Sequence, residues 1–248
     1  MVKYSVEING IQVEAAYSEN SVNDLFLPLL KHLTDMQKNK GGRIFAMLAA
    51  PPGAGKSTLC SFLEKLSKET EEVCNVQAIG MDGFHRRQEY LLSHTTLRDG
   101  EEVRMVDIKG APVTFDLEKL TAAIRTVTSG KDCYWPTYDR HLHNPVEDAI
   151  HVTGDIILLE GNYLLLDEEG WRDLKEMADY TISISVDEEM LRDRLIDRKM
   201  KSGNDREKAT DFVDFSDMSN VRLCLGKSRK ADLMLVVSES GEYSRAIL

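Results

Sequence analysis

The sequence is poor in cysteine, proline and tryptophan, and it has no long apolar run. Among its 248 residues only 4 are Cys, 6 are Pro and 2 are Trp. The cysteines are scattered without a Cys-x-x-Cys pair, which indicates reduced thiols in a cytoplasmic protein and not a disulfide framework or a zinc site. No apolar stretch approaches about 18 residues, and polar and apolar side chains alternate from the start, so we expect no membrane span and no signal peptide.

Positive charge is also in short supply, because 31 Lys and Arg residues stand against 42 Asp and Glu residues and give a formal charge of −11. General binding to nucleic acid or to anionic membranes needs a positive surface, so we expect neither as a partner. A small anionic ligand is still compatible with this charge, because a local site can be positive on an acidic protein. The composition, 42% hydrophobic and 29% charged, is that of a folded globular chain.

Two patterns follow one another along the chain, and together they predict a single domain over residues 1–248. Residues 1–42 form an N-terminal extension. In this extension, strict alternation on both sides of Asn9-Gly10 predicts a β-hairpin, and apolar residues at helical spacing from Val22 to Met36 predict a helix.

From Arg43 onward, five short apolar runs alternate with amphipathic stretches. The apolar runs are Ile44–Ala49, Val73–Met81, Asp155–Leu159, Tyr180–Val186 and Asp232–Val237. The amphipathic stretches are Thr58–Lys68, Phe115–Ser129, Trp171–Ala178, Glu188–Lys201 and a part of Asp205–Leu225. Continuous apolar strands separated by helices are typical of a parallel sheet that is covered on both faces. We therefore expect an α/β fold with a parallel five-stranded sheet.

A glycine-rich turn follows the first apolar run and leads into a helix. It matches the phosphate-loop pattern G-x-x-x-x-G-K-[ST], except that Ala50 replaces the first glycine. Backbone N–H groups of such a loop and of the helix start bind phosphate oxygens. The expected ATP-binding residues are Pro52, Gly53, Ala54, Gly55, Lys56, Ser57 and Thr58. Lys56 would contact the β- and γ-phosphates and Ser57 would bind Mg²⁺; a chance turn is disfavoured because the flanking elements are those the motif needs.

Two carboxylates end two of the apolar runs. Asp82 follows the second run, and the carboxyl ends of parallel strands carry the site in such sheets. A kinase needs a carboxylate that orients and deprotonates the acceptor hydroxyl, a role we assign to Asp82; the alternative is a turn aspartate before Gly83. Glu160 follows the third run and would bind Mg²⁺ or the acceptor, or only cap the strand. No guanine-binding Asn-Lys-x-Asp segment is present, which argues against a GTPase.

These segments together resemble the phosphoribulokinase/uridine kinase family, which includes the bacterial-type pantothenate kinases. The resemblance is carried by Ala50–Thr58, Met81–Phe84, Pro136–Asp139 with His143, and Leu159–Gly161. Residues 109–116, 138–145 and 160–166 are also similar to a bacterial subgroup described as nucleoside/nucleotide or fructose kinases. The resemblance covers the chain from about residue 43 onward. It implies a P-loop kinase fold, ATP and Mg²⁺ as cofactors, and a small-molecule hydroxyl acceptor.

The resemblance also implies roles for single residues. Asp82 would activate the acceptor hydroxyl, and Tyr138 and His143 would line the acceptor pocket. At position 140 the pantothenate kinases have His and the uridine kinases usually have an aromatic residue, whereas this chain has Arg140, which suits a polyhydroxylated or anionic acceptor. The further expected acceptor contacts are His85, Arg86, Lys109, Glu160 and Tyr163.

Arg194 and Arg198 lie on the helix expected over Glu188–Lys201, on the same side as its apolar residues. The family has a lid there, so we expect both guanidinium groups to act with Lys56 on the transferred phosphoryl group; pairing within the helix is the alternative. The sequence thus predicts an ATP-dependent kinase that phosphorylates a hydroxyl of a nucleoside or sugar-like metabolite. Pantothenate-kinase-like activity and a nucleotide-binding regulatory protein without phosphotransfer are the alternatives, and the N-terminal hairpin offers an edge for a possible homodimer.

Overall fold

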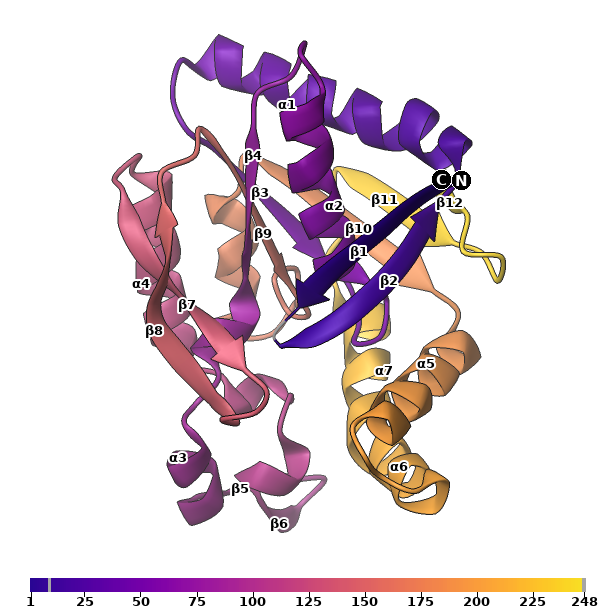
Figure 1. Ribbon diagram of the computed structural model, residues 1–248. Coiled ribbons are helices and arrows are strands. Elements are labelled where there is room, and N and C mark those ends of the chain that lie inside the picture. The colour runs from indigo at the N-terminus through magenta and orange to yellow at the C-terminus, as the bar shows by residue number, and fades with distance from the viewer. Residues whose placement is uncertain (9, 247–248) are drawn as a thin grey trace.

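A central sheet flanked by helices dominates the computed structural model, which describes residues 1–8 and 10–246 (Figure 1). The sheet strands are β3 (Ile44–Ala49), β4 (Val76–Gly80), β9 (Ile156–Gly161), β10 (Tyr180–Val186), β11 (Leu233–Val237) and β12 (Tyr243–Arg245). Their order across the sheet is β12-β11-β10-β3-β9-β4. The five expected strands pair in parallel, which confirms the predicted α/β fold. The sheet has six strands and not five, because the short β12 adds to β11 in antiparallel orientation.

The helices cover both faces of this sheet. They are α1 (Leu27–Lys40), α2 (Lys56–Glu69), α3 (Gln88–Ser93), α4 (Leu117–Thr128), α5 (Glu188–Lys201), α6 (Arg206–Phe212) and α7 (Met218–Lys227). Every residue of β3 is buried, and alternate residues enter different cores. Ile44, Ala46 and Leu48 pack in the core that includes α1 and α2, whereas Phe45 and Met47 pack in the core that includes α4. Burial on both faces explains why the strand is apolar throughout.

Several predicted helices differ in detail from the structure. A π-helical turn (Ser21–Phe26) runs directly into α1, and Pro28, which has no N–H to donate, is the second residue of α1. The stretch expected as a helix at Trp171–Ala178 contains a 3-10 helix, Arg172–Met177. The region after Asp205 divides into α6, a π-helical turn (Val213–Asp217) and α7. Among the described residues, none of the helices is both long and apolar enough to cross a bilayer.

Among the residues that the structure describes, three antiparallel hairpins lie outside the central sheet. The predicted N-terminal hairpin is formed by β1 (Val2–Ile8) and β2 (Ile11–Tyr17), while Asn9 of the expected turn lies outside the described residues. The other two hairpins are β5 (Thr95–Arg98) with β6 (Glu101–Arg104) and β7 (Cys133–Asp139) with β8 (Asn144–Val152). Neither was predicted, because their strands are partly exposed and carry no continuous apolar run. Shorter 3-10 segments are Met81–Phe84, Met105–Ile108 and Pro112–Thr114.

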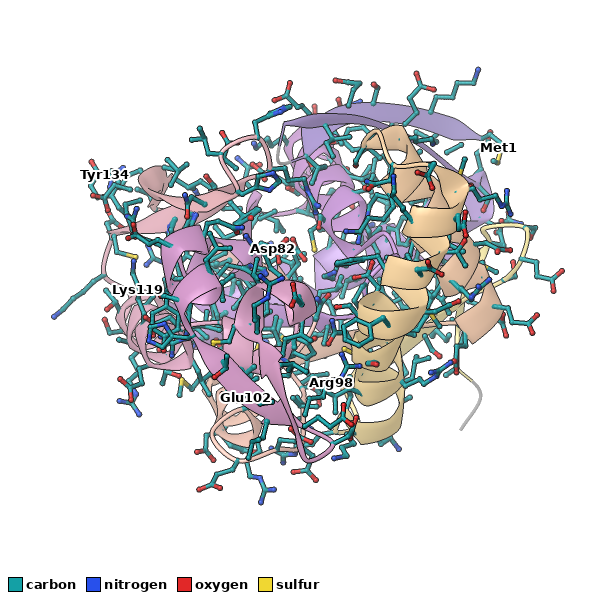
Figure 2. The ribbon with its side chains drawn as sticks, turned by 90° about the horizontal axis from the view of Figure 1, so that it is seen from below. Met1, Asp82, Arg98, Glu102, Lys119 and Tyr134 are labelled. Carbon is teal, nitrogen blue, oxygen red and sulfur yellow. The ribbon has the colours of Figure 1, made fainter. Side chains whose placement is uncertain are left out.

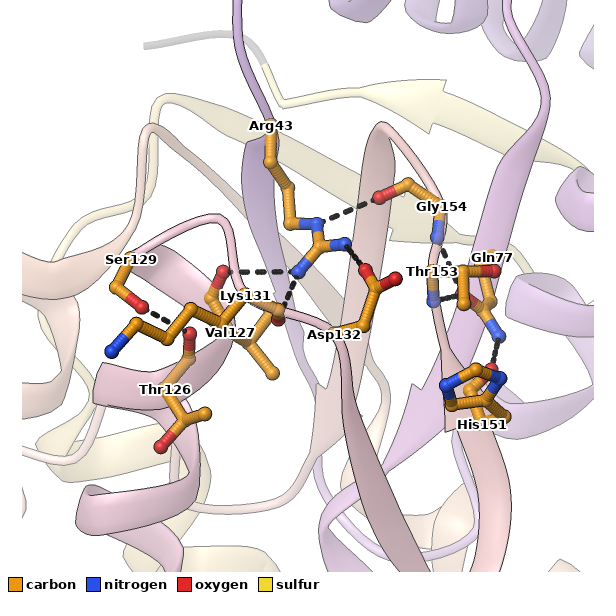
Figure 3. Close-up of polar contacts among 10 residues, drawn as sticks. All are labelled: Arg43, Gln77, Thr126, Val127, Ser129, Lys131, Asp132, His151, Thr153 and Gly154. Carbon is orange, nitrogen blue, oxygen red and sulfur yellow. Dashed lines mark hydrogen bonds and ion pairs between the residues drawn. The ribbon is translucent and has the colours of Figure 1, made fainter.

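Arg43, directly before β3, ties together three segments at the amino-terminal edge of the sheet (Figure 3). Its guanidinium donates to the carbonyl oxygens of Gly154 at 2.8 Å and Lys131 at 2.6 Å, and it pairs with the Asp132 carboxylate at 2.8 Å. The Arg43 side chain is only 6% exposed. Removing it would take the shared donor from three segments and leave a gap where the buried side chain packs, which costs more than an exposed ion pair contributes.

We predict that Arg43→Ala lowers the free energy of unfolding by about 1–3 kcal/mol, because three segments lose their shared donor and a buried side chain is removed. Arg104→Ala is the matched control, since the Arg104 side chain is 62% exposed and its pair with Asp107 is on the surface. The control should cost less than about 1 kcal/mol. Urea unfolding measures both values, and equal losses would show that Arg43 stabilises the protein no more than an exposed ion pair does.

Candidate active site

The predicted phosphate loop lies between β3 and α2, as the motif requires. Gly53 and Gly55 have φ values of 81° and 84°, a left-handed conformation that glycine adopts without strain. A Cβ atom on Gly53 would lie 3.2 Å from Cγ of Leu195, so this part of the loop is packed against α5. Gly55 has open space around it and leads directly into Lys56 and Ser57, the first residues of α2. The loop therefore presents N–H groups and a helix start to solvent, which is the arrangement that binds phosphate.

Ser57 is joined to Glu160 across this loop. The Ser57 hydroxyl donates to Oε1 of Glu160 at 2.8 Å. Glu160 stands near the carboxyl end of β9, between β3 and β4, and is 8% exposed. Burial raises the pKa of Glu160, and the nearby Asp82 carboxylate raises it further, against the opposing effects of Lys56 and Ser57. The two predicted metal-binding residues are thus in direct contact.

Asp82 lies in the 3-10 turn that follows β4, close to the same group of charges. Burial would raise the pKa of Asp82, but the positive charges of neighbouring residues outweigh burial and lower it. These neighbours are His85, Lys56, Arg140 and Arg198. Asp82 is therefore ionised at neutral pH, as a carboxylate must be to accept a proton from a hydroxyl group.

The His85 side chain packs between two aromatic rings beside Asp82. Its Nδ1 donates to the backbone carbonyl of Asp82 at 2.9 Å, and its ring centre lies 3.9 Å from that of Phe115 and 5.0 Å from that of Tyr138. Burial lowers the pKa of His85, while the Asp82 carboxylate raises it. The other positive charges that act on Asp82 are those of Lys56, Arg140 and Arg198.

The turn that carries Asp82 is pressed against β7. A Cβ atom on Gly83 would lie 2.2 Å from the carbonyl oxygen of Pro136, so only glycine fits there. The Trp135 indole donates to the carbonyl of Gly80 at 2.8 Å, and its ring meets that of Phe84 edge to face at 4.8 Å. These contacts fix the backbone on both sides of Asp82, and they explain why Trp135 is a packing residue.

The Lys109 side chain joins two of the expected acceptor segments. Its Nζ donates to Oε1 of Gln88 at 2.7 Å and to the carbonyl of His143 at 3.0 Å, and it lies 5.0 Å from the centre of the Tyr138 ring. Burial lowers the pKa of Lys109 to about 8. The His143 side chain itself is exposed, and its backbone is left-handed with φ 52°. His143 thus contacts Lys109 through its backbone carbonyl, and Tyr138 contacts Lys109 through its ring.

Tyr163 and Arg86, two other residues expected to contact the acceptor, have protein neighbours in the structure. Tyr163 is fully buried, and its hydroxyl donates to the carbonyl of Gly110 at 2.6 Å, so it supports the loop next to Lys109 and does not face a ligand directly. Arg86 lies over the Tyr90 ring at 4.8 Å. The Nε atom of Arg86 is buried without a hydrogen-bond partner among the described residues.

Arg194 and Arg198 occupy one side of α5 but meet different neighbours. The charge of Arg198 acts on Asp82 and on Asp217, whereas that of Arg194 acts on Tyr243 of β12. Burial, followed by repulsion from Arg140, lowers the pKa of Arg198. The structure therefore brings Arg198 to the charges around Asp82 and leaves Arg194 farther along the helix.

Asp217 is the charged neighbour of Arg198 that sequence reasoning missed. It is 7% exposed, and its Oδ2 atom has no hydrogen-bond partner among the described residues. Burial raises the pKa of Asp217, while the charges of Arg198 and Lys199 lower it. The spacing could have indicated that Asp217 is buried, because it lies four residues from both Val213 and Val221, which are buried apolar residues.

Several known proteins are similar to this chain in sequence or in fold. A sequence profile described as the "Phosphoribulokinase / Uridine kinase family" matches residues 45–240. The "Uncharacterized protein YggC" of Escherichia coli K12 is 40% identical over 243 residues, which are 98% of each chain. A "putative uridine kinase" of Schizosaccharomyces pombe is 32% identical over 86% of this chain and 88% of its own. The crystal structure of a "putative fructose transport system kinase" from Silicibacter sp. has a TM-score of 0.69 at 29% identity, covering 82% of this chain and 98% of that one.

The packing of the Asp82 turn against β7 leads to a stability prediction. Gly83→Ala should lower the free energy of unfolding by about 1–3 kcal/mol, because the new methyl group meets backbone that cannot move aside. Gly42→Ala is the control, since a Cβ atom there has nothing within 4 Å and Gly42 has no positive φ. Denaturant unfolding of both variants measures the difference, and a Gly83→Ala protein as stable as the control would contradict the close packing.

Proposed function

The chain belongs to the phosphoribulokinase/uridine kinase family, and from this premise we propose that it transfers the γ-phosphoryl group of Mg-ATP to a hydroxyl of a nucleoside or sugar-like metabolite. One observation carries the proposal beyond family membership. Two carboxylates, the half-buried Asp82 and the buried Glu160, follow neighbouring strands beside Lys56 of the phosphate loop. An ionised carboxylate at this place is what a hydroxyl acceptor requires and what a nucleotide switch does not need.

The residues present fit a magnesium ion held with the nucleotide. Ser57 and Glu160 offer two oxygen atoms that are 2.8 Å apart, and oxygen donors are those Mg²⁺ prefers. Within the part of the chain that the structure describes, no group of three or more His, Cys, Asp or Glu side chains could hold a metal by itself. A metal here would therefore need phosphate oxygens and water to complete its shell, as is usual for Mg²⁺ in kinases. When bound, it would supply positive charge to the phosphates.

The chain's own residues have separate parts in the proposed transfer. The N–H groups of the phosphate loop and the Lys56 ammonium hold the β- and γ-phosphates, and the ionised Asp82 orients the acceptor hydroxyl and accepts its proton. Arg140 and Arg198 lie near enough for their charges to act on Asp82, so they can also offset charge that builds on the transferred group. Because the transition state is loose, positioning and electrostatic stabilisation supply most of the rate.

The proposal is tested by measuring ADP release with Mg-ATP over a panel of nucleosides, neutral sugars and pantothenate. We expect at least one nucleoside or sugar to raise ADP release about tenfold or more above hydrolysis by water alone. Lys56→Met should then lower the rate by about 10²-fold or more, because a preorganised charge on the phosphates is lost. Lys31→Met, which removes an exposed lysine on α1, is the matched control and should leave the rate unchanged.

The panel also separates the alternatives. Stimulation by pantothenate alone would contradict the nucleoside or sugar-like acceptor and favour a pantothenate kinase. Hydrolysis at the water level with every acceptor would contradict phosphotransfer and favour a nucleotide-binding regulatory protein.

A further inference from the structure

The N-terminal hairpin lies outside residues 45–240, the segment that matches the family, yet it is firmly attached to the helix of the phosphate loop. The Tyr4 hydroxyl of β1 shares a hydrogen bond of 2.7 Å with the Ser61 hydroxyl of α2. The Phe62 ring of α2 lies 5.3 Å from the Tyr4 ring and 4.5 Å from the Tyr17 ring. These contacts join both strands of the hairpin to α2, so they fix the hairpin relative to Ser57 at the start of that helix.

The other end of the hairpin reaches the opposite side of the site. We define the hairpin tip as Glu7, Ile8 and Gly10. A Cβ atom on Gly10 would lie 3.1 Å from Cδ2 of His141, which is in the turn between β7 and β8 and follows Arg140. Figure 1 shows the tip directed from α2 toward the β7–β8 hairpin. The N-terminal hairpin therefore bridges two elements that carry predicted site residues.

A cavity of about 270 Å³ lies beneath this bridge. It is lined by Asp82, Ser57 and Glu160 of the site, by Tyr138 of β7, and by Glu7 and Ile8 of the hairpin tip. Its volume is near the lower limit of about 300 Å³ for small-molecule pockets. Asp82, labelled at the centre of the view in Figure 2, thus borders a space that the hairpin tip helps to enclose.

The charged side chains that line the cavity are all acidic. Four carboxyl groups line the cavity, those of Glu7, Glu64, Asp82 and Glu160, and no Lys or Arg residue is among the lining residues. Glu64 is already engaged, since it pairs with Lys68 at 2.7 Å and accepts from the N–H of Ala78 at 3.2 Å. Glu7 is exposed on the tip. Lys56, Arg140 and Arg198, whose charges act on Asp82, are not among the lining residues, so an anionic group on the Glu7 side of the cavity would face a like charge, which is unfavourable.

We propose that the hairpin tip is a wall of the acceptor site, and that Ile8 limits the size and Glu7 the charge of the acceptor portion that fits beside Asp82. The inference rests on the proposed phosphotransfer. The portion of the acceptor in the cavity is an uncharged or cationic polyhydroxyl group, and acceptors with a carboxylate or phosphate at that end are rejected.

The size limit is tested with Ile8→Trp against the matched control Ala16→Trp, which adds the same bulk at an exposed position near the far end of the hairpin. With the best acceptor from the panel, Ile8→Trp should raise the KM for the acceptor about tenfold or more and leave the KM for ATP within about twofold. Ala16→Trp should leave both KM values within about twofold. Circular dichroism and thermal unfolding show whether Ile8→Trp is folded.

The charge limit is tested with Glu7→Lys against Glu14→Lys, an exposed residue of β2 that does not line the cavity. The readout is kcat/KM for the best acceptor divided by kcat/KM for its carboxylate-bearing analogue. Glu7→Lys should lower this ratio about fivefold or more, and Glu14→Lys should not change it. This arm does not depend on Ile8→Trp folding, because Glu7 is exposed.

The possible failures are distinct. If Ile8→Trp raises the acceptor KM no more than Ala16→Trp does, or if Glu7→Lys and Glu14→Lys give the same ratio, the wall is contradicted while phosphotransfer stands. If the unaltered protein phosphorylates no acceptor, the proposed function is contradicted and this inference fails with it.

Discussion

The hydrogen bond from Ser57 to Glu160 joins the phosphate loop to the next strand of the sheet, and the rest of the site is arranged around it. It places a hydroxyl of α2 against a carboxyl group of β9 at 2.8 Å, inside a region where Glu160 is almost fully buried. Placing the buried Glu160 beside the half-buried Asp82 is costly unless positive charge and hydrogen bonds compensate. Lys56, Arg140 and Arg198 supply that charge, so the site consists of groups that stabilise one another only when all are in place.

Glycine stands at two positions of this site where a side chain would meet a neighbouring group. Gly80 lies beside Glu160, where a Cβ atom would be 3.2 Å from Oε1, and Gly83 lies against Pro136, where a Cβ atom would collide. The indole of Trp135 holds the carbonyl of Gly80 from the other side. Asp82, between these two glycines, is therefore positioned by the packing of the turn Met81–Phe84 against β7, and its backbone carbonyl accepts a hydrogen bond from His85. This is the preorganisation that electrostatic catalysis requires.

Much of the fold and part of the site could be predicted from the sequence. The bounds of β3 and β10 and of α5 were predicted to the residue, because burial on two faces or a capped helical pattern leaves a clear signal. The β5–β6 and β7–β8 hairpins could not be predicted in this way, since their strands are partly exposed and form no continuous apolar run. Spacing also could not separate Arg194 from Arg198, which share a side of α5 and differ only in what the fold brings to each.

The central claim is that Asp82 acts on the acceptor hydroxyl and not on the nucleotide. It is tested most directly by single-turnover transfer from Mg-ATP to the best acceptor with Asp82→Asn, beside a separate measurement of the dissociation constant for ATP. Asp107→Asn, a partly exposed aspartate paired with Arg104, is the control. The account predicts that Asp82→Asn lowers the transfer rate by about 10²–10⁴-fold while the dissociation constant for ATP stays within about threefold. Transfer by Asp82→Asn at a rate near that of the unaltered protein would contradict it.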